Sequence, residues 1–231
     1  MTVSSAIRQT IAQHRWVWLS MVLGFAFLYY ALQLTDVVIA IGHWPNYITF
    51  YNYPANVLRI IRSTPDVRDM LPIIGNEWLV ETGYMTHAYG HGIAEWSLEI
   101  LPARLVLVLL LGALSATSAL LLHGMRGVCR CFDGALGAAA TGLGALSAGI
   151  ANVTMTWVAC CASPSWVVGL TLLGLGTPTA YALLPYGELL SAAGFVLVGG
   201  TTVFLARRRA AAARGLPPSR PPRALQVPGR P

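Results

Sequence analysis

Residues 103–123 read ARLVLVLLLGALSATSALLLH, and this stretch decides the expected fold class. Its only charged side chain, Arg104, lies at the very start, and leucine, valine and alanine fill most of the rest. A helix needs roughly 20 apolar residues to cross about 30 Å of hydrocarbon, so this run is long enough to span a membrane. Four further runs have a comparable length and composition: 16–41, 135–160, 164–186 and 188–206.

The composition of the whole chain supports a membrane protein. Of its 231 residues 55% are hydrophobic and 10% are charged, and the mean hydropathy is +0.61, which is too apolar for an ordinary water-soluble domain. In lipid an open chain can satisfy its backbone only as helices. We therefore predict an all-α integral membrane protein with five helical segments, of which four or five cross the bilayer, plus an aromatic-rich interfacial loop.

The five runs divide the chain into four parts. The first, residues 1–42, contains the N-terminus and a first transmembrane helix that is too long for a signal peptide and is followed by no small-x-small cleavage site. Residues 43–102 form an interfacial or extramembrane segment, and residues 103–206 form a membrane helix bundle. The remainder, 207–231, is rich in arginine and proline, and we expect a disordered tail there.

The 43–102 segment is dense in tryptophan and tyrosine, which suits the headgroup layer of a bilayer. Its prolines divide it, and we expect short amphipathic helices to begin near Pro54 and Asn76. The predicted partners are therefore the lipid bilayer and other membrane-protein subunits. All fifteen basic residues are arginines and seven lie in the tail, a distribution that indicates membrane topology and not nucleic-acid binding.

Arginine counting leaves two orientations open. With five crossings the N-terminus lies outside, and with four it lies inside; each puts eleven arginines in the cytoplasm and four outside. Both orientations make the C-terminal tail cytoplasmic. We expect a location in the bacterial inner (cytoplasmic) membrane.

The four cysteines form two close pairs, Cys129 with Cys131 and the adjacent Cys160 and Cys161. Adjacent cysteines can be small packing residues, a redox pair or soft metal ligands. Two thiolates suffice for Cu(I) or Hg(II), which accept two ligands. Pro164 suits the first turn of a helix, so we expect a helix break at the cysteine pair, where free N–H groups would favour the thiolate.

The order of motifs after this pair resembles the MerT family of mercuric-ion transport proteins. Cys160 and Cys161 are followed by Pro164, LTLLGLG, LLPYGEL and the closing RRR, and the resemblance covers residues 160–209. It implies that Cys160 and Cys161 accept a soft metal ion, Cu or Hg, within the membrane.

A second candidate metal site lies in HAYGHGIAEW, where His87, His91 and Glu95 are spaced four residues apart. On an α-helix this spacing puts the three side chains on one face, where they could bind a divalent metal. The alternative is a surface helix whose polar face happens to hold histidines. We expect the metal-binding residues to come from this set and from the cysteines.

Two functions fit these patterns. The first is a multi-pass membrane protein that binds or transports a soft metal ion through its thiols. The second is a non-catalytic accessory or scaffold subunit of a larger membrane complex, which the aromatic segment favours. A thiol-disulfide enzyme fits less well because no CxxC motif accompanies the pair, and no nucleophile elbow or HExxH motif is present. An enzymatic role is therefore the weaker expectation.

Overall fold

The computed structural model of the protein describes residues 2–88, 90, 92–125, 155–158, 161–164 and 187–215. Its elements, in chain order, are α1 (Val3–Gln13), α2 (Arg15–Ile41), β1 (Tyr47–Phe50), α3 (Tyr53–Ser63), α4 (Val67–Gly75), β2 (Val80–Thr86), β3 (Ile93–Ile100), α5 (Pro102–Met125), β4 (Met155–Val158), β5 (Cys161–Pro164) and α9 (Gly187–Gly215).

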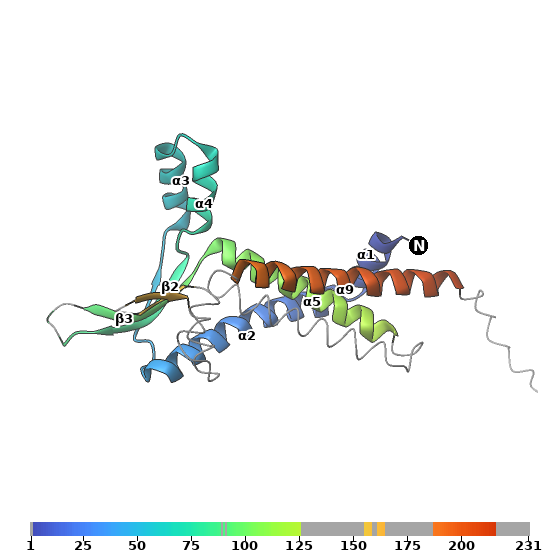
Figure 1. Ribbon diagram of the computed structural model, residues 1–231, viewed down its shortest axis with the longest axis horizontal. Helices are drawn as coiled ribbons and strands as arrows, with labels where there is room; N and C mark the ends of the chain where they lie inside the picture. The colour runs from blue at the N-terminus through green and yellow to red at the C-terminus, as the bar shows by residue number, and fades with distance from the viewer. Residues whose placement is uncertain are drawn as a thin grey trace, which may run out of the picture.

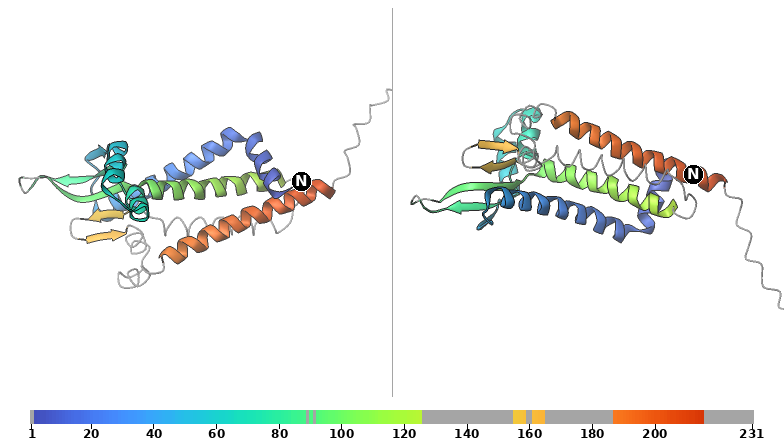
Figure 2. Two further views of the ribbon diagram at one scale, coloured as in Figure 1. Left: turned by 90° about the horizontal axis from the view of Figure 1, so that it is seen from above. Right: turned by 60° about the horizontal axis from the view of Figure 1, so that its bottom comes forward.

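The molecule has a helical bundle and a head. The bundle consists of the long helices α2, α5 and α9, which lie along the long axis of the molecule, with α2 running opposite to the other two (Figure 1). The head consists of the strands β1 to β5 and the helices α3 and α4, and it lies at one end of the bundle. Helix α1 and the C-terminal end of α9 lie at the opposite end (Figure 2).

The bundle is held together by apolar packing around α5. Leu111 of α5 and Val198 of α9 are fully buried, and Phe25 of α2 packs against them. Gly112 makes this approach possible, because a Cβ there would lie 3.1 Å from the Phe25 ring and 3.3 Å from the backbone of α2. Small residues at helix contacts allow such close packing in membrane and soluble bundles alike.

Hydrogen bonds between hydroxyl and indole groups also join the three helices. The hydroxyls of Ser118 in α5 and Thr202 in α9 lie 2.8 Å apart and are buried. On the other side of α5, the indole Nε1 of Trp18 donates to the Thr117 hydroxyl at 3.0 Å. These bonds fix the rotation of α2 and α9 relative to α5.

Helix α1 crosses the end of the bundle that lies away from the head. Its Val3 and Ile7 pack on a cluster formed by Leu121 of α5 and Leu205 and Ala206 of α9. The Arg209 guanidinium in α9 donates to the Thr10 hydroxyl of α1 at 2.9 Å. The N-terminal residues and the last turns of α9 are therefore at the same end of the molecule.

The strands form one antiparallel sheet in the order β1-β2-β3-β4-β5. A bulge interrupts the β2–β3 pairing between Tyr84 and Met85, and the Asn46 side chain binds both backbone groups of Met85, each at 2.8 Å. Met85 lies beyond the part of β2 that pairs with β1. The Asn46 side chain supplies the hydrogen-bond partners that β1 does not provide there.

The head is attached to the bundle through one face of this sheet. Trp96 and Leu98 of β3 are buried against Val37 and Val38 near the end of α2. That helix ends at Gly42, whose φ of +87° is a left-handed conformation favoured by glycine and lets the chain turn away into the head.

The predicted fold class is wrong. The head contains an antiparallel sheet, so the protein is not all-α, and two of the described helices are long and apolar enough to cross a membrane, Arg15–Ile39 and Pro102–Gly124. An apolar composition does not exclude a sheet, because a segment with access to water can leave sheet edges open.

The helices predicted over 16–41 and 103–123 correspond to α2 and α5, and the helix predicted near Pro54 is α3. The helix predicted near Asn76 is wrong because that region forms β2 and β3. The predicted 188–206 helix is confirmed as α9, but it continues to Gly215, so the expected tail does not begin at 207. Residues 216–231 lie outside the described residues.

Candidate functional site

The predicted cysteine site falls almost entirely outside the described residues and stays a prediction. Cys129, Cys131 and Cys160 lie outside the described residues. Cys161 is the first residue of β5, where its backbone pairs with Val158 of β4. The expected start of a helix at Pro164 is wrong, because Pro164 is the last residue of this strand.

The histidine site is not tested as a whole, but the helix expected to carry it is not formed by the described residues of this segment. His87 follows β2, His91 lies outside the described residues, and Glu95 lies within β3. The predicted helical face is wrong, because in a strand the four-residue spacing no longer stacks side chains on neighbouring turns. Within the described part of the chain, no three His, Cys, Asp or Glu side chains lie close enough together to hold a metal ion.

A different pair of ionisable residues is brought together by the sheet. Glu81 of β2 and Glu99 of β3 are directly opposite in the antiparallel register, so their side chains project from the same face. This face is opposite to the one that carries Trp96 and Leu98 towards α2, because side chains alternate along a strand. Like charges that face each other across strands are unfavourable unless one of them is neutralised.

Two phenols bind the first carboxylate of this pair. The Tyr47 hydroxyl donates to Glu81 Oε1 at 2.7 Å, and the Tyr51 hydroxyl donates to Glu81 Oε2 in a short contact. Glycine at position 83 leaves room for this arrangement, since a Cβ there would lie 2.9 Å from the Tyr47 hydroxyl oxygen. Both oxygens of Glu81 are therefore occupied.

The second carboxylate is more deeply buried and has weaker partners. Glu99 is 3% exposed, and the Ser97 hydroxyl donates to it at the long distance of 3.5 Å. Burial, with the neighbouring Glu81 carboxylate as the second cause, raises the pKa of Glu99 to about 7. Burial and the hydrogen bond to Glu81 also raise the pKa of Tyr51 to about 12 and that of Tyr47 above its usual value, so both phenols remain donors.

The cluster of Tyr47, Tyr51, Glu81 and Glu99 can therefore bind one proton at neutral pH. Glu81 accepts hydrogen bonds from two phenols, whereas Glu99 lacks such donors, and the raised pKa of Glu99 favours its protonated form. Sequence reasoning missed this cluster because the segment was interpreted with a helical period. The signal was present in IAEWSLEI, where apolar and polar residues alternate strictly between Trp96 and Ile100, as in a half-buried strand.

A second feature of the head is the aromatic edge, which we define as Trp44, Ile48 and Phe50. These side chains are 72%, 59% and 73% exposed. Ile48 and Phe50 lie on β1, an edge strand of the sheet, and project from the same face of it. Within the described residues nothing covers these three large apolar groups, and an exposed apolar strand edge is a surface for another chain.

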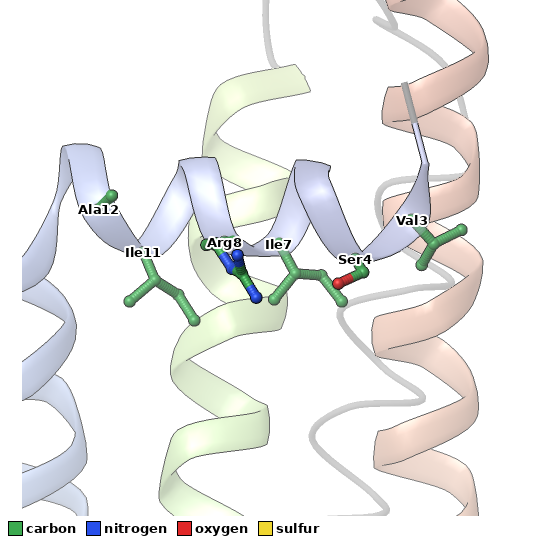
Figure 3. Close-up of a pocket in the computed structure, with 6 residues that line it drawn as sticks. All are labelled: Val3, Ser4, Ile7, Arg8, Ile11 and Ala12. Atoms are coloured by element: carbon green, nitrogen blue, oxygen red, sulfur yellow. The ribbon is translucent and has the colours of Figure 1, made fainter.

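A shallow depression lies along α1 at the other end of the molecule. Val3, Ser4, Ile7, Arg8, Ile11 and Ala12 line about 710 Å³ of open space. Figure 3 shows these side chains on α1, which crosses in front of the bundle helices. Arg8 is its only charged side chain, so the depression offers no set of groups that would select a substrate.

Comparison of the chain with protein-family models, with curated proteins and with solved structures finds no match. The resemblance to the MerT family thus stays a prediction that rests on residues 160–209.

Proposed function

We propose that this chain is a membrane-anchored, non-catalytic accessory subunit that holds a partner membrane protein against its head. The observation that carries the proposal is the combination of an apolar helical bundle with an uncovered aromatic edge on the attached head. The bundle is the anchor and the aromatic edge is the contact surface.

The anchor is supported by the outward-facing side chains of the bundle. Phe27, Leu32 and Ile39 of α2 are 78%, 60% and 70% exposed, and Val106 of α5 is 63% exposed. In the most apolar 18-residue stretch of each helix, only 22% is buried within the protein in α2 and 39% in α5. The core helix of a water-soluble protein is mostly buried. Burying such a surface in lipid removes it from water at a gain of about 25 cal/mol per Å².

The first long helix also behaves as a permanent part of the bundle. A cleaved signal sequence would make no lasting contacts, whereas α2 packs its Phe25 into the core of the bundle and bonds α5 through Trp18. This supports the retained anchor that the sequence predicts.

The arrangement of the chain ends supports one of the two orientations considered. The contact between Thr10 and Arg209 puts the N-terminal residues and the end of α9 at the same end of the bundle, and so on the same side of the membrane. This does not fit the five-crossing orientation, in which the N-terminus lies outside and the C-terminal tail lies in the cytoplasm. That side carries Arg8, Arg15 and the RRR run that ends at Arg209, so by the positive-inside rule it faces the cytoplasm. The head then lies on the opposite side of the inner membrane.

The contact surface is tested by site-specific photo-crosslinking in native membranes. A photoreactive phenylalanine analogue at Phe50 should give a discrete adduct with one partner, and the same analogue at the adjacent Thr49, which projects from the other face of β1, is the matched control. Retention of the protein in carbonate-washed membranes checks the anchor separately. Equal adducts from both positions would refute a specific aromatic edge, and release by carbonate would refute the anchor.

Soft-metal binding by Cys160 and Cys161 is the second candidate function. The observation that favours it is the adjacent pair of cysteines, since two thiolates suffice to bind Cu(I) or Hg(II). Metal analysis of the purified protein beside a variant that lacks both thiols separates this candidate from the accessory role.

A further inference from the structure

The helices α3 and α4 form a hairpin, residues 53–75, that the proposed contact surface leaves unused. The Tyr53 hydroxyl donates to the Ile74 carbonyl at 3.4 Å, and the Asn56 amide donates to Glu77 at 2.7 Å, so the hairpin is closed at its base. Neither helix has a buried residue. An isolated hairpin of this kind cannot derive much stability from its own core.

The hairpin has a large apolar surface that no described residue covers. Leu58 and Ile61 of α3 are 55% and 47% exposed, and Val67 and Leu71 of α4 are 61% and 64% exposed. The spacings of three and four residues place each pair on one side of its helix. These four side chains are the apolar face of the hairpin.

Positive charge lies beside this apolar face. Arg59 follows directly after Leu58 and lies on the adjoining side of α3, whereas Arg62 is four residues from Leu58 and lies on the same side as Leu58. This helix has no acidic residue. Amphipathic helices with arginine on the polar side and large apolar groups on the other typically lie in the interface of a bilayer.

The position of the hairpin matches the expected bilayer surface. It stands across the axis of the bundle at the end where α5 begins, and both views in Figure 2 agree with Figure 1 in this. Gly75 at the end of α4 lies against the first turn of α5, because a Cβ there would be 3.3 Å from Ala103 Cβ. The hairpin is thus level with the start of the apolar α5 run and perpendicular to it. Trp78 lies at the base of the hairpin, and its ring centroid is 5.4 Å from that of Tyr51 in an edge-to-face contact. Tryptophan is enriched at the headgroup level of membranes, so this position fits the expected bilayer surface.

We propose that the α3–α4 hairpin lies in the headgroup layer of the bilayer, with Leu58, Ile61, Val67 and Leu71 at the acyl boundary and its arginines on anionic phosphate groups. This inference rests on the proposed function, because the bundle must span the bilayer for the hairpin to meet its surface. The hairpin then fixes the tilt of the head, so that the aromatic edge meets a partner at a constant height above the membrane.

The test uses the full-length protein in vesicles that contain a photoactivatable phosphatidylglycerol within phosphatidylcholine. After irradiation, lipid adducts are mapped by mass spectrometry of peptides. We expect adducts on peptides from α2 and α5 and also on the 53–75 peptide. The variant Leu58→Asp should lose the 53–75 adducts, whereas the matched control Ser63→Asp should keep them, because it adds the same charge to the opposite side of α3.

The outcomes separate the two proposals. Adducts on α2 and α5 without adducts on 53–75 would overturn the hairpin proposal and leave the anchor intact, whereas no adducts anywhere would overturn the anchor itself. An unchanged circular dichroism spectrum of the aspartate variant shows that the lost adducts do not result from unfolding, and persistence of the adducts in that variant would also overturn the proposal.

Discussion

Glu99→Gln should make the protein more stable above neutral pH and leave it unchanged in acid. The folded-state pKa of Glu99 is raised to about 7 from an ordinary value of 4.5. Folding therefore favours the protonated form, and the stability that comes with it is fully present below the ordinary pKa. That stability is lost as the pH rises towards the folded-state pKa, above which the loss is complete and constant. Glutamine keeps the shape of the side chain and the acceptor for Ser97 but never ionises.

The magnitude follows from the size of the shift. Each pKa unit corresponds to about 1.4 kcal/mol, so the full shift from 4.5 to about 7 would correspond to roughly 3.5 kcal/mol of lost stability above pH 7. Relaxation of the structure and water that penetrates to the ionised carboxylate reduce this, and we expect a gain of about 1–2 kcal/mol for Glu99→Gln at alkaline pH. In a chain of this size that corresponds to a rise in melting temperature of roughly 2–8 °C.

The assay is thermal unfolding of the purified protein in detergent, followed by tryptophan fluorescence at several pH values between about 4 and 9. Glu95→Gln is the matched control, since it makes the same change on the same strand at a half-buried position without a facing carboxylate. We expect the melting temperatures of the wild type and the Glu99 variant to coincide in acid and to separate near neutrality. Parallel pH profiles for the wild type and the Glu99 variant would refute the reasoning that burial opposite Glu81 raises the pKa of Glu99.

Three further predictions can be checked with the same preparation. Gly83→Ala should lower the free energy of unfolding by about 1–3 kcal/mol, because the new Cβ would lie 2.2 Å from a carbonyl oxygen of β3; denaturation that matches the wild type would contradict this. Ser118→Ala and Thr202→Ala should show a coupling energy of about 0.6 kcal/mol in a double-mutant cycle, as is typical of hydrogen bonds between membrane helices, and additive effects would argue against the bond. Cys160→Ser with Cys161→Ser should abolish Cu(I) or Hg(II) binding if the second candidate function is right, and unchanged metal stoichiometry would eliminate it.

Parts of the fold could be predicted because they depend on local pattern alone. The run at 103–123 became α5 with little change in its bounds, since a long apolar stretch forms a helix wherever it is shielded from water. The proline near the start of α3 likewise marks its first turn. The cysteine and histidine sites could not be tested in the same way, because a ligand set depends on which distant segments meet, and several of these residues lie outside the described part of the chain.

The head shows where pattern reasoning failed and why. His87, His91 and Glu95 are spaced four residues apart, which favours a helix, whereas the alternation that favours a strand begins only at Trp96. The spacing of the three candidate ligands therefore predicted a helix for a segment that forms two strands. The glycine at position 90, with φ of +83°, fits the turn between β2 and β3 and could have indicated the hairpin.

The sequence by itself determined the long apolar helices and the concentration of arginine near the chain ends, because both follow from the local balance between water and hydrocarbon. Only the tertiary structure decided that Glu81 and Glu99 face each other, that Thr10 meets Arg209, and that the α3–α4 hairpin stands across the bundle. These relations join residues far apart in the chain or depend on strand register, where a slip of one position would send every side chain to the other face. Register and helix contacts are set by the packing of complete elements, and no single stretch of sequence contains that information.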